Sequence, residues 1–291
     1  MGEQGDKGQE VGAVCAVCPH GCRIRPGKLG VCGARSALDG KVVSLNYGRS
    51  SGLALDPIEK KPLACFHPGA FILSYGSFGC NMRCPFCQNS SISTARADDA
   101  PPIPTRYLAP EDLVAQAISL KPQGNIGIAL TYNEPFIAWE YLMDVCRCAR
   151  EAGLVTAAVT NGYVARDAWM QSLPYLDAAN IDLKCFSEAG YLGLGAPGGL
   201  SVVKGSIESA HAAGVHVEVT TLVVPGLSDD EDAFREECLW LSSISPEIPL
   251  HITRFFPCHK ALDKQATSVK TLMRFKEVAK GHLHNVFLGN I

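Results

Sequence analysis

The sequence predicts an α/β fold with a parallel sheet, preceded by a small cysteine-rich module, on three observations. From residue 70 onward, apolar segments of strand length alternate with amphipathic segments of helical period. Before residue 53 the chain is instead rich in Gly and Cys and shows little periodicity. Hydrophobic residues make up 47% of the 291 residues, which is enough for a sizeable core. We therefore expect a Cys-rich metal-binding module over 13–52, an extended connector over 53–69 and a core domain over 70–291.

Six repeats of a strand followed by a helix account for the core domain. Pro110, Glu111 and Asp112 predict the start of the first helix, because Pro fits an early helical position and acids favour the first turn. Gly153 and Gly214 follow the last periodic residues of two other helices, as capping glycines do. The expected strands cover 71–75, 126–130, 154–160, 178–183, 216–224 and 251–256, with a further short strand at 285–288. The first expected helix begins near residue 110, and the others cover 137–152, 165–173, 200–213, 229–243 and 269–280.

The order of these elements predicts their topology. Repeated strand–helix units imply a parallel sheet with right-handed crossovers. A complete eight-fold barrel would need more chain than the core domain contains. In such sheets ligands bind at the carboxyl ends of the strands. The connector contains three prolines, which favour an extended conformation.

Three cysteines follow the first strand of the core domain. Cys80, Cys84 and Cys87 have the spacing C-x3-C-x2-C, and their thiolates can hold three irons of a cubic four-iron cluster. Closed electron-transfer clusters take four protein thiolates, so a loop that offers three leaves one iron open to an outside ligand. A structural metal knuckle, or chance clustering in a cysteine-rich chain, is the alternative interpretation.

Four further cysteines lie in the N-terminal module. Cys15, Cys18, Cys22 and Cys32 have the spacing C-x2-C-x3-C-x9-C, which fills a tetrahedral zinc site or equally a closed iron–sulfur cluster. We expect about one zinc per chain at this site, with a second cluster as the other outcome. A closed site has no room for a substrate, so its role would be structural or electron-relaying. Free thiols for disulfide exchange are the weaker alternative.

Polar residues follow the second and third strands. Asn133 and Glu134 directly precede Pro135, which can start the next helix, and a Glu in this position needs a partner if it is buried. Helix capping is the simpler interpretation of this pair. The third strand ends in Thr160 and Asn161, followed by a Gly, a combination that brings backbone close to a ligand or forms an ordinary turn.

The fourth and sixth strands carry ionisable residues. Asp182 and Lys184 share one face by strand alternation. An acid and a base that point into a barrel are costly unless they pair with each other or with a charged ligand. His259 follows the sixth strand, and a single His is more often a core or surface residue than a ligand.

Composition limits the partners and the compartment. The formal net charge is −3 and there is no basic block, which argues against a nucleic-acid partner. No stretch reaches the roughly 18 to 20 apolar residues of a membrane span. Residues 1–11 are polar and lack the apolar core of a signal peptide. Seven of the 13 cysteines fall in the two groups with metal-ligand spacing, which indicates metal binding in a reducing compartment. We expect a cytoplasmic protein.

Several short motifs occur together over residues 13 to 291. Besides the C-x3-C-x-aromatic-C loop, in which Phe86 is the aromatic, they are CPHGC at 18–22, GVCGAR at 30–35, YG at 47–48, DPIEKKP at 56–62, FGCN at 78–81, CQN at 87–89, TYNEP at 131–135 and LGN at 288–290. In this combination the chain resembles the AmmeMemoRadiSam system radical S-adenosylmethionine (SAM) enzymes. That branch is similar to the pyruvate formate-lyase activating enzymes.

The resemblance implies an incomplete (βα)6 barrel and a mechanism. SAM would bind the open iron of a [4Fe-4S] cluster held by Cys80, Cys84 and Cys87. A one-electron reductant of the flavodoxin or ferredoxin type would reduce the cluster. SAM would then break to methionine and a 5′-deoxyadenosyl radical, which abstracts hydrogen from a protein or small molecule. Activation of a glycyl-radical enzyme is the most concrete form of this activity.

The resemblance also implies residues that contact SAM. Many radical SAM enzymes hold the SAM amino group with Gly-Gly-Glu, where this chain has Tyr-Asn-Glu and so keeps Glu134 as the acceptor. The Asp-x-Lys at 182–184 matches one that lies beside SAM in pyruvate formate-lyase activating enzymes. Cofactor binding is thus expected for Phe86, Asn133, Glu134, Thr160, Asn161, Asp182, Lys184 and His259. The Cys258-His259 pair departs from the branch, which more often has Asp-Tyr there.

Two other functions remain open. One is a non-catalytic iron–sulfur electron-transfer protein with two clusters, against which the missing fourth cysteine near Cys87 counts. The other is a zinc-bearing protein that modifies RNA, which the charge balance disfavours. The sequence does not name the substrate.

Overall fold

A single eight-stranded sheet organises the protein in the computed structural model, which describes residues 12–291. Strand β6 is antiparallel to β7, and every other neighbouring pair is parallel. Within the described residues the edge strands β6 and β14 do not pair with each other, so the barrel is open. The strands, in spatial order, are β14 (Val286–Gly289), β13 (Leu250–Arg254), β12 (His216–Val223), β11 (Ala178–Asp182), β10 (Val155–Thr160), β9 (Asn125–Leu130), β7 (Phe71–Gly76) and β6 (Gly52–Pro57).

The predicted helices follow these strands, and the predicted fold class is confirmed. Helix α2 (Pro110–Ser119) has Pro at its first position and acids in its first turn. In α7 (Glu231–Ile244) the Asp230 side chain caps the helix by accepting a hydrogen bond of 2.8 Å from the Ala233 N–H. The other α-helices are α1 (Ser90–Ser93), α3 (Trp139–Glu151), α4 (Arg166–Ser172), α5 (Glu188–Gly193), α6 (Gly199–Ala212) and α8 (Val269–Lys280). The 3-10 turns are η1 (Ile58–Lys60), η2 (Lys121–Gln123), η3 (Pro135–Ala138) and η4 (Leu173–Tyr175).

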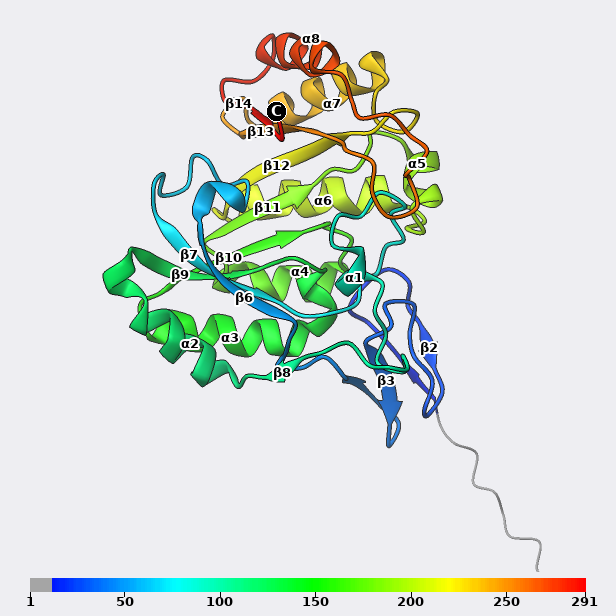
Figure 1. Ribbon diagram of the computed structural model, residues 1–291, viewed down its shortest axis with the longest axis vertical. Helices are drawn as coiled ribbons and strands as arrows, with labels where there is room; N and C mark the ends of the chain where they lie inside the picture. The colour runs from blue at the N-terminus through cyan, green and yellow to red at the C-terminus, as the bar shows by residue number, and fades with distance from the viewer. Residues whose placement is uncertain (1–11) are drawn as a thin grey trace, which may run out of the picture.

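The N-terminal module lies at the carboxyl edge of the sheet. Figure 1 shows its strands on the side toward which the arrowheads of β10 and β11 point, next to the loop that carries α1. The module contains two antiparallel hairpins, and a further short pair joins it to the core domain. These strands are β1 (Ala13–Val14) with β2 (Arg23–Ile24), β3 (Arg35–Leu38) with β4 (Lys41–Ser44), and β5 (Arg49–Ser50) with β8 (Arg106–Tyr107).

The segment expected as an extended connector has an additional structural role. Its first part forms β6, the antiparallel edge strand of the main sheet. The following loop is fixed to the inside of the barrel, because the buried Glu218 carboxylate accepts hydrogen bonds from the Ala64 and Cys65 N–H groups at 2.9 and 2.8 Å. Proline content predicts extended chain but not strand pairing, which depends on a partner elsewhere in the sequence.

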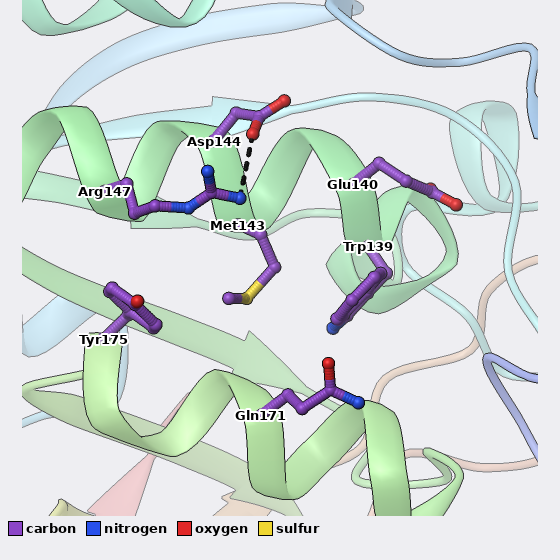
Figure 2. Close-up of a pocket in the computed structure, with 7 residues that line it drawn as sticks. All are labelled: Trp139, Glu140, Met143, Asp144, Arg147, Gln171 and Tyr175. Atoms are coloured by element: carbon purple, nitrogen blue, oxygen red, sulfur yellow. Dashed lines mark ion pairs between the residues drawn. The ribbon is translucent and has the colours of Figure 1, made fainter.

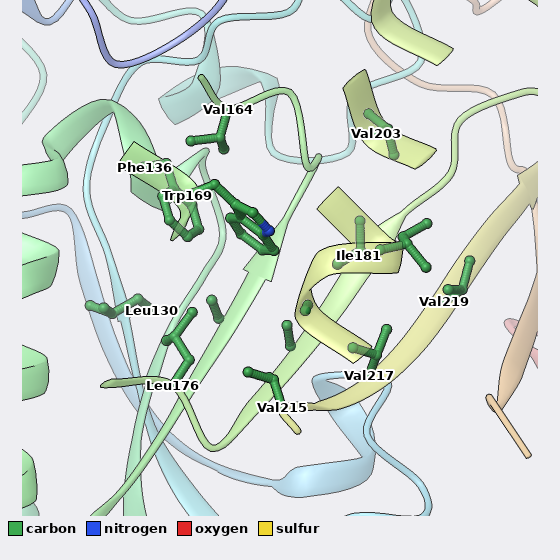
Figure 3. Packing of buried hydrophobic residues seen from close by; sticks show 14 of the residues in the cluster. Leu130, Phe136, Val164, Trp169, Leu176, Ile181, Val203, Val215, Val217 and Val219 are labelled. Atoms are coloured by element: carbon green, nitrogen blue, oxygen red, sulfur yellow. The ribbon is translucent and has the colours of Figure 1, made fainter. Parts of the chain in front are cut away.

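The main core lies between the sheet and the helices that cover it. Figure 3 shows apolar side chains of β11, β12 and α6 that pack together around Ile181, Val203 and Val219. Trp169 of α4 is fully buried and lies against Phe136, with ring centroids 5.0 Å apart. Because this layer fixes the strands from outside, the polar residues at their carboxyl ends occupy defined positions.

One acidic side chain, Glu237 of α7, lies within this core. It is 1% exposed, and its carboxylate accepts a hydrogen bond from the Thr221 hydroxyl of β12. Burial raises the pKa of the Glu237 carboxyl to about 8, although the Thr221 hydroxyl partly lowers it. Its pKa in the unfolded chain is near 4.5, so the folded state holds a proton that the unfolded state releases first.

We expect stability to depend on pH through Glu237. A carboxyl whose folded pKa is raised stabilises the protein fully below the unfolded pKa, and this stabilisation is lost as pH rises through the folded pKa. The free energy of unfolding should therefore fall between about pH 4.5 and pH 8, by up to about 1.4 kcal/mol per pH unit. The Glu237→Gln variant should lack this fall in urea unfolding curves measured at pH 5, 6.5 and 8. Glu236→Gln, at the exposed neighbouring position, is the matched control, and an equal slope in both variants would contradict the assignment.

None of the helices within residues 12–291 combines the length and apolar character that a membrane span requires. Residues 1–11, on which the expectation about a signal peptide depends, lie outside the described residues.

Candidate functional site

The cysteine loop leaves the carboxyl end of β7 and is held at its start by Asn133. The Asn133 Oδ1 atom accepts a hydrogen bond of 2.9 Å from the Ser77 N–H, and its Nδ2 atom donates to the Phe78 and Gly79 carbonyls at 3.2 and 3.1 Å. Gly79 has a φ of +85°, and a Cβ there would lie 2.6 Å from the Cys32 carbonyl oxygen. The loop can therefore follow this path only with glycine at this position.

Two buried asparagines hold the first cysteine. The Asn161 Nδ2 atom, at the carboxyl end of β10, lies 2.8 Å from Asn81 Oδ1 and 3.6 Å from Cys80 Sγ. Asn81 Nδ2 in turn donates to the Tyr163 carbonyl at 2.7 Å, and the Met82 N–H lies 3.4 Å from Cys80 Sγ. Two N–H donors thus face this sulfur, an arrangement that stabilises a metal-bound thiolate.

The three thiols of the loop interact electrostatically. Burial, followed by the charges of Glu134 and Cys84, raises the pKa of the Cys80 thiol. Burial also raises the pKa of Cys84 to about 11, while the Lys184 ammonium partly lowers it. Each thiol binds iron only as a thiolate, so binding of a metal displaces these protons. The chemistry of this donor set, three thiols with two N–H donors at Cys80, suits a [4Fe-4S] cluster with three protein ligands, and the role of the three cysteines as ligands stays a prediction.

Asp182 and Lys184 form an ion pair beside the cysteine loop. The Lys184 Nζ atom lies 2.6 Å from Asp182 Oδ2, and the two side chains are 18% and 28% exposed. Burial opposes the charge on Lys184, but Asp182 and the Cys84 thiol outweigh this and raise the pKa of the lysine. An ammonium that is charged at neutral pH therefore lies near Cys84 at the end of β11, while part of the pair remains accessible.

Glu134 lies deeper than this pair. It is 2% exposed, and its Oε1 atom accepts hydrogen bonds from the Thr160 hydroxyl and the Phe136 N–H at 2.8 and 3.1 Å. Its Oε2 atom accepts one from the Asn161 N–H at 2.8 Å. Burial raises the pKa of Glu134 to about 7 despite these donors. The carboxyl joins the ends of β9 and β10, and its contact with SAM stays a prediction.

The β13–α8 loop closes over the second half of the cysteine loop. Phe86 is buried in an apolar cluster with Val224 and Phe255. The Cys258 thiol lies 3.1 Å from the Phe86 carbonyl oxygen. Burial, followed by the charge of the nearby Cys87, raises the pKa of Cys258. His259, which was expected to bind cofactor, is half-buried in this loop, and its φ of +52° is unusual for a non-Gly residue.

The four N-terminal cysteines lie near one another on the β1–β2 hairpin and the following loop. The Cys15 N–H donates to the Cys22 carbonyl at 2.9 Å, and the Val31 N–H lies 3.5 Å from Cys22 Sγ. Burial raises the pKa of Cys18 to about 12, with further contributions from the thiols of Cys15, Cys32 and Cys22. Across residues 12–291, no three His, Cys, Asp or Glu side chains converge closely enough to hold a single metal ion. A zinc ion or cluster at these four cysteines therefore stays a prediction.

A separate groove lies on the helical layer, between α3 and α4. Its volume is about 580 Å³, and Figure 2 shows an Asp144–Arg147 ion pair along its wall. None of the predicted site residues lines it. The residues that line the groove are Trp139, Glu140, Met143, Asp144, Arg147, Gln171 and Tyr175.

Comparison with known proteins identifies the family. The model of the radical SAM superfamily matches residues 75–238, which include the cysteine loop and the strand ends around it. The chain belongs to the radical SAM superfamily. Superfamily membership implies a [4Fe-4S] cluster, SAM and a reductant, and it confirms the expected chemistry of SAM cleavage.

Individual relatives agree with this assignment. An uncharacterized protein of Methanocaldococcus jannaschii is 36% identical over 95% of this chain and 81% of its own length. A pyruvate formate-lyase-activating enzyme of Clostridium pasteurianum is 26% identical over 54% of this chain and 64% of its own length. A radical SAM methyltransferase of Sphaerobacter thermophilus shares the fold, with a TM-score of 0.56 and 16% identity over 77% of this chain and 67% of that one. The chain is thus a radical SAM protein similar to pyruvate formate-lyase activating enzymes.

In this radical SAM protein the sequence motifs did not reveal the contacts that hold the cysteine loop. Asn81 and Arg83 lie between Cys80 and Cys84, and both bind backbone carbonyls, Asn81 that of Tyr163 and Arg83 that of Cys80. Their place inside the loop was the only signal available in the sequence. The structure also joins Asn161 to the loop, where the sequence predicted a contact with the cofactor.

Proposed function

We propose that this protein cleaves SAM reductively and uses the product to abstract a hydrogen atom from a protein substrate, as an activating enzyme. The observation that carries the proposal is the cysteine loop, with three thiols, N–H donors at Cys80 and the Lys184 ammonium on one side. When bound, the reduced cluster and SAM supply a 5′-deoxyadenosyl radical. The chain would position these reactants through its own side chains.

Two charged residues would bind the amino-acid part of SAM, and a third would hold one of them in place. The Lys184 ammonium would pair with the SAM carboxylate, and Asp182 keeps this ammonium in place from 2.6 Å. Glu134 Oε2 accepts one hydrogen bond, so one of its lone pairs remains for the SAM amino group. Asn133, Thr160 and Asn161 would orient this site through their contacts with the loop and with Glu134.

Replacing Lys184 with Met should weaken SAM binding. Loss of one charged hydrogen bond costs about 1.5–3 kcal/mol, which corresponds to a Kd about ten- to a hundred-fold higher. The iron content should stay unchanged, because Lys184 is no cluster ligand in this proposal. Equilibrium dialysis of anaerobically reconstituted protein with labelled SAM measures the Kd, and iron analysis of the same sample measures the iron content. Lys270→Met, at an exposed position of α8, is the control, and equal Kd values in both variants would contradict the assignment.

A glycyl-radical enzyme is the protein substrate that we propose. Support comes from the similarity to a protein named as a pyruvate formate-lyase-activating enzyme. An activating enzyme of this kind would act in the reducing cytoplasm, where iron–sulfur clusters and free thiols persist. Incubation with SAM, a reductant and a glycyl-radical enzyme should give 5′-deoxyadenosine and the EPR doublet of a glycyl radical. 5′-Deoxyadenosine without the doublet would contradict this substrate, and no 5′-deoxyadenosine would indicate an electron-transfer protein instead.

The four N-terminal cysteines would bind a second metal centre. Their thiols lie close enough to raise the pKa of Cys18, and two of them are buried. Metal analysis of a variant with Ala at positions 80, 84 and 87 distinguishes the outcomes, since it retains only this centre. About one zinc or about four irons per chain would identify the metal. If the variant held neither zinc nor iron, a metal site at these cysteines would be ruled out.

A further inference from the structure

We propose that His20, a residue of the N-terminal module, is a positioning residue for the catalytic cluster. Its ring hydrogen-bonds the peptide group that joins Asn81 to Met82, and the N–H of this peptide faces the Cys80 sulfur. In this proposal the bond from His20 strengthens the N–H donor at Cys80 and so raises the reduction potential of the cluster. The inference rests on the proposed function, because it assumes that Cys80 is a cluster ligand. It requires no metal at the N-terminal cysteines.

The first support is the direction of the hydrogen bond from His20. The His20 Nε2 atom lies 2.8 Å from the Asn81 carbonyl oxygen. A carbonyl oxygen only accepts hydrogen bonds, so Nε2 is the donor and carries a proton. The N–H of the same peptide group is that of Met82, and it lies 3.4 Å from Cys80 Sγ. Hydrogen bonds in a chain polarise one another, so a donor at the peptide oxygen makes the peptide N–H a stronger donor to the sulfur.

The second support is that Asn81 also holds the other N–H donor at Cys80. The Asn161 Nδ2 atom lies 2.8 Å from Asn81 Oδ1 and 3.6 Å from Cys80 Sγ. Both donors therefore depend on the position of Asn81, which is 1% exposed. Hydrogen bonds to the sulfurs are among the factors that set the reduction potential of an iron–sulfur cluster. A residue that fixes Asn81 thus acts on both donors at once.

His20 is itself held in place from two sides. Its ring lies edge-on to the ring of Tyr163, with centroids 5.4 Å apart, and Tyr163 is fully buried. The Gly21 N–H donates to the Cys18 carbonyl at 3.2 Å, which closes a turn that contains His20. The histidine therefore presents its Nε2 atom to the loop in a fixed orientation, as a positioning residue must.

A second contact between the module and the cysteine loop differs in where it ends. The Arg83 guanidinium donates to the Val31 carbonyl of the module and to the Met82 carbonyl of the loop. The N–H of this second peptide belongs to Arg83 and donates to the Leu194 carbonyl at 2.8 Å. The Arg83 contacts thus fasten the loop to the module, whereas the His20 contact ends on the peptide that faces the sulfur.

The reduction potential of the cluster tests the proposal in two variants. His20→Phe keeps a ring beside Tyr163 but removes the donor, and it should make reduction of the cluster about ten-fold less favourable. For a one-electron couple this corresponds to a potential about 59 mV lower. His20→Gln offers an amide N–H in place of the ring N–H and should restore most of the loss. Anaerobic redox titration of the reconstituted proteins without SAM, followed by EPR, measures the midpoint potential.

The matched control is His211→Phe, which replaces an exposed histidine of α6 and should keep the potential and iron content of the parent. Equal potentials in the parent and in His20→Phe would overturn the proposal. Equal losses in His20→Phe and His20→Gln would also overturn it, because the loss would then not depend on the donor. If only His20→Phe lost its iron and His20→Gln had the parent's potential, the role of the donor would be supported. Loss of iron from both variants would show a role in assembly and overturn the proposal.

The parent protein tests the proposed function separately. A parent that holds the cluster but forms no 5′-deoxyadenosine with SAM and dithionite would overturn the proposed function, whatever the potentials of the variants. A parent that does form 5′-deoxyadenosine, and whose potential equals that of His20→Phe, would overturn only the role of His20.

Discussion

The Cys84→Ala variant is expected to lose both its catalytic cluster and all SAM cleavage. Three thiolates leave one iron open, and removal of one of them leaves two irons without a protein ligand. Cys84 lies at the centre of the loop, where the Lys184 ammonium partly lowers its pKa. Iron analysis should therefore show a loss of about four irons per chain. In the same sample, 5′-deoxyadenosine should be undetectable by chromatography after incubation with SAM and dithionite.

The control is Cys65→Ala, because Cys65 is exposed and lies outside both cysteine groups. This variant should keep the iron content and the 5′-deoxyadenosine yield of the parent. If Cys84→Ala still produced 5′-deoxyadenosine, the assignment of the three cysteines as cluster ligands would be wrong. A loss of activity in the Cys65 variant as well would point to a general effect of thiol removal.

The Trp169→Ala variant is expected to show the largest loss of stability. Trp169 is fully buried, its ring packs on Phe136, and its Nε1–H donates to the Ser206 carbonyl at 3.1 Å. Replacement of a buried Trp by Ala removes this packing and leaves a cavity, which costs about 3–5 kcal/mol of unfolding free energy. Urea unfolding followed by circular dichroism measures the change.

A milder substitution at the same position keeps the test informative. Trp169→Phe retains most of the apolar area and should cost less than Trp169→Ala, even if the Ala variant fails to fold. Met170→Ala, at the neighbouring position that is 43% exposed, should change the unfolding free energy by less than about 0.5 kcal/mol. Equal effects at positions 169 and 170 would show that α4 does not pack as described.

Local patterns in the sequence predicted most of the core domain. The strand–helix alternation and capping residues such as Pro110 are short-range signals, and the structure confirms the elements that they predict. Helices α1 and α5 were not predicted, because four and six residues are too few to show a helical period. The pairing of β6 with β7 was also missed, since strand pairing depends on a partner and not on composition.

The candidate site likewise has some features that the sequence predicted and others that it did not. The spacing of Cys80, Cys84 and Cys87 is a local signal, and so is the alternation that places Asp182 and Lys184 on one face. The contacts of Asn81 with Asn161 and with His20 join residues that are 80 and 61 positions apart. Such contacts arise only when the chain is folded, so spacing could not predict them.

These long-range contacts have a consequence for the maturation of the protein. Asn133, Asn161 and His20 reach the cysteine loop from three different parts of the chain. The loop therefore acquires its shape only after the N-terminal module, β9 and β10 have come together. A ribosome-bound chain that has emerged only as far as Cys87 lacks both asparagines. We therefore expect iron delivery to follow synthesis of the chain at least as far as Asn161, and not to occur on a nascent chain that ends at Cys87.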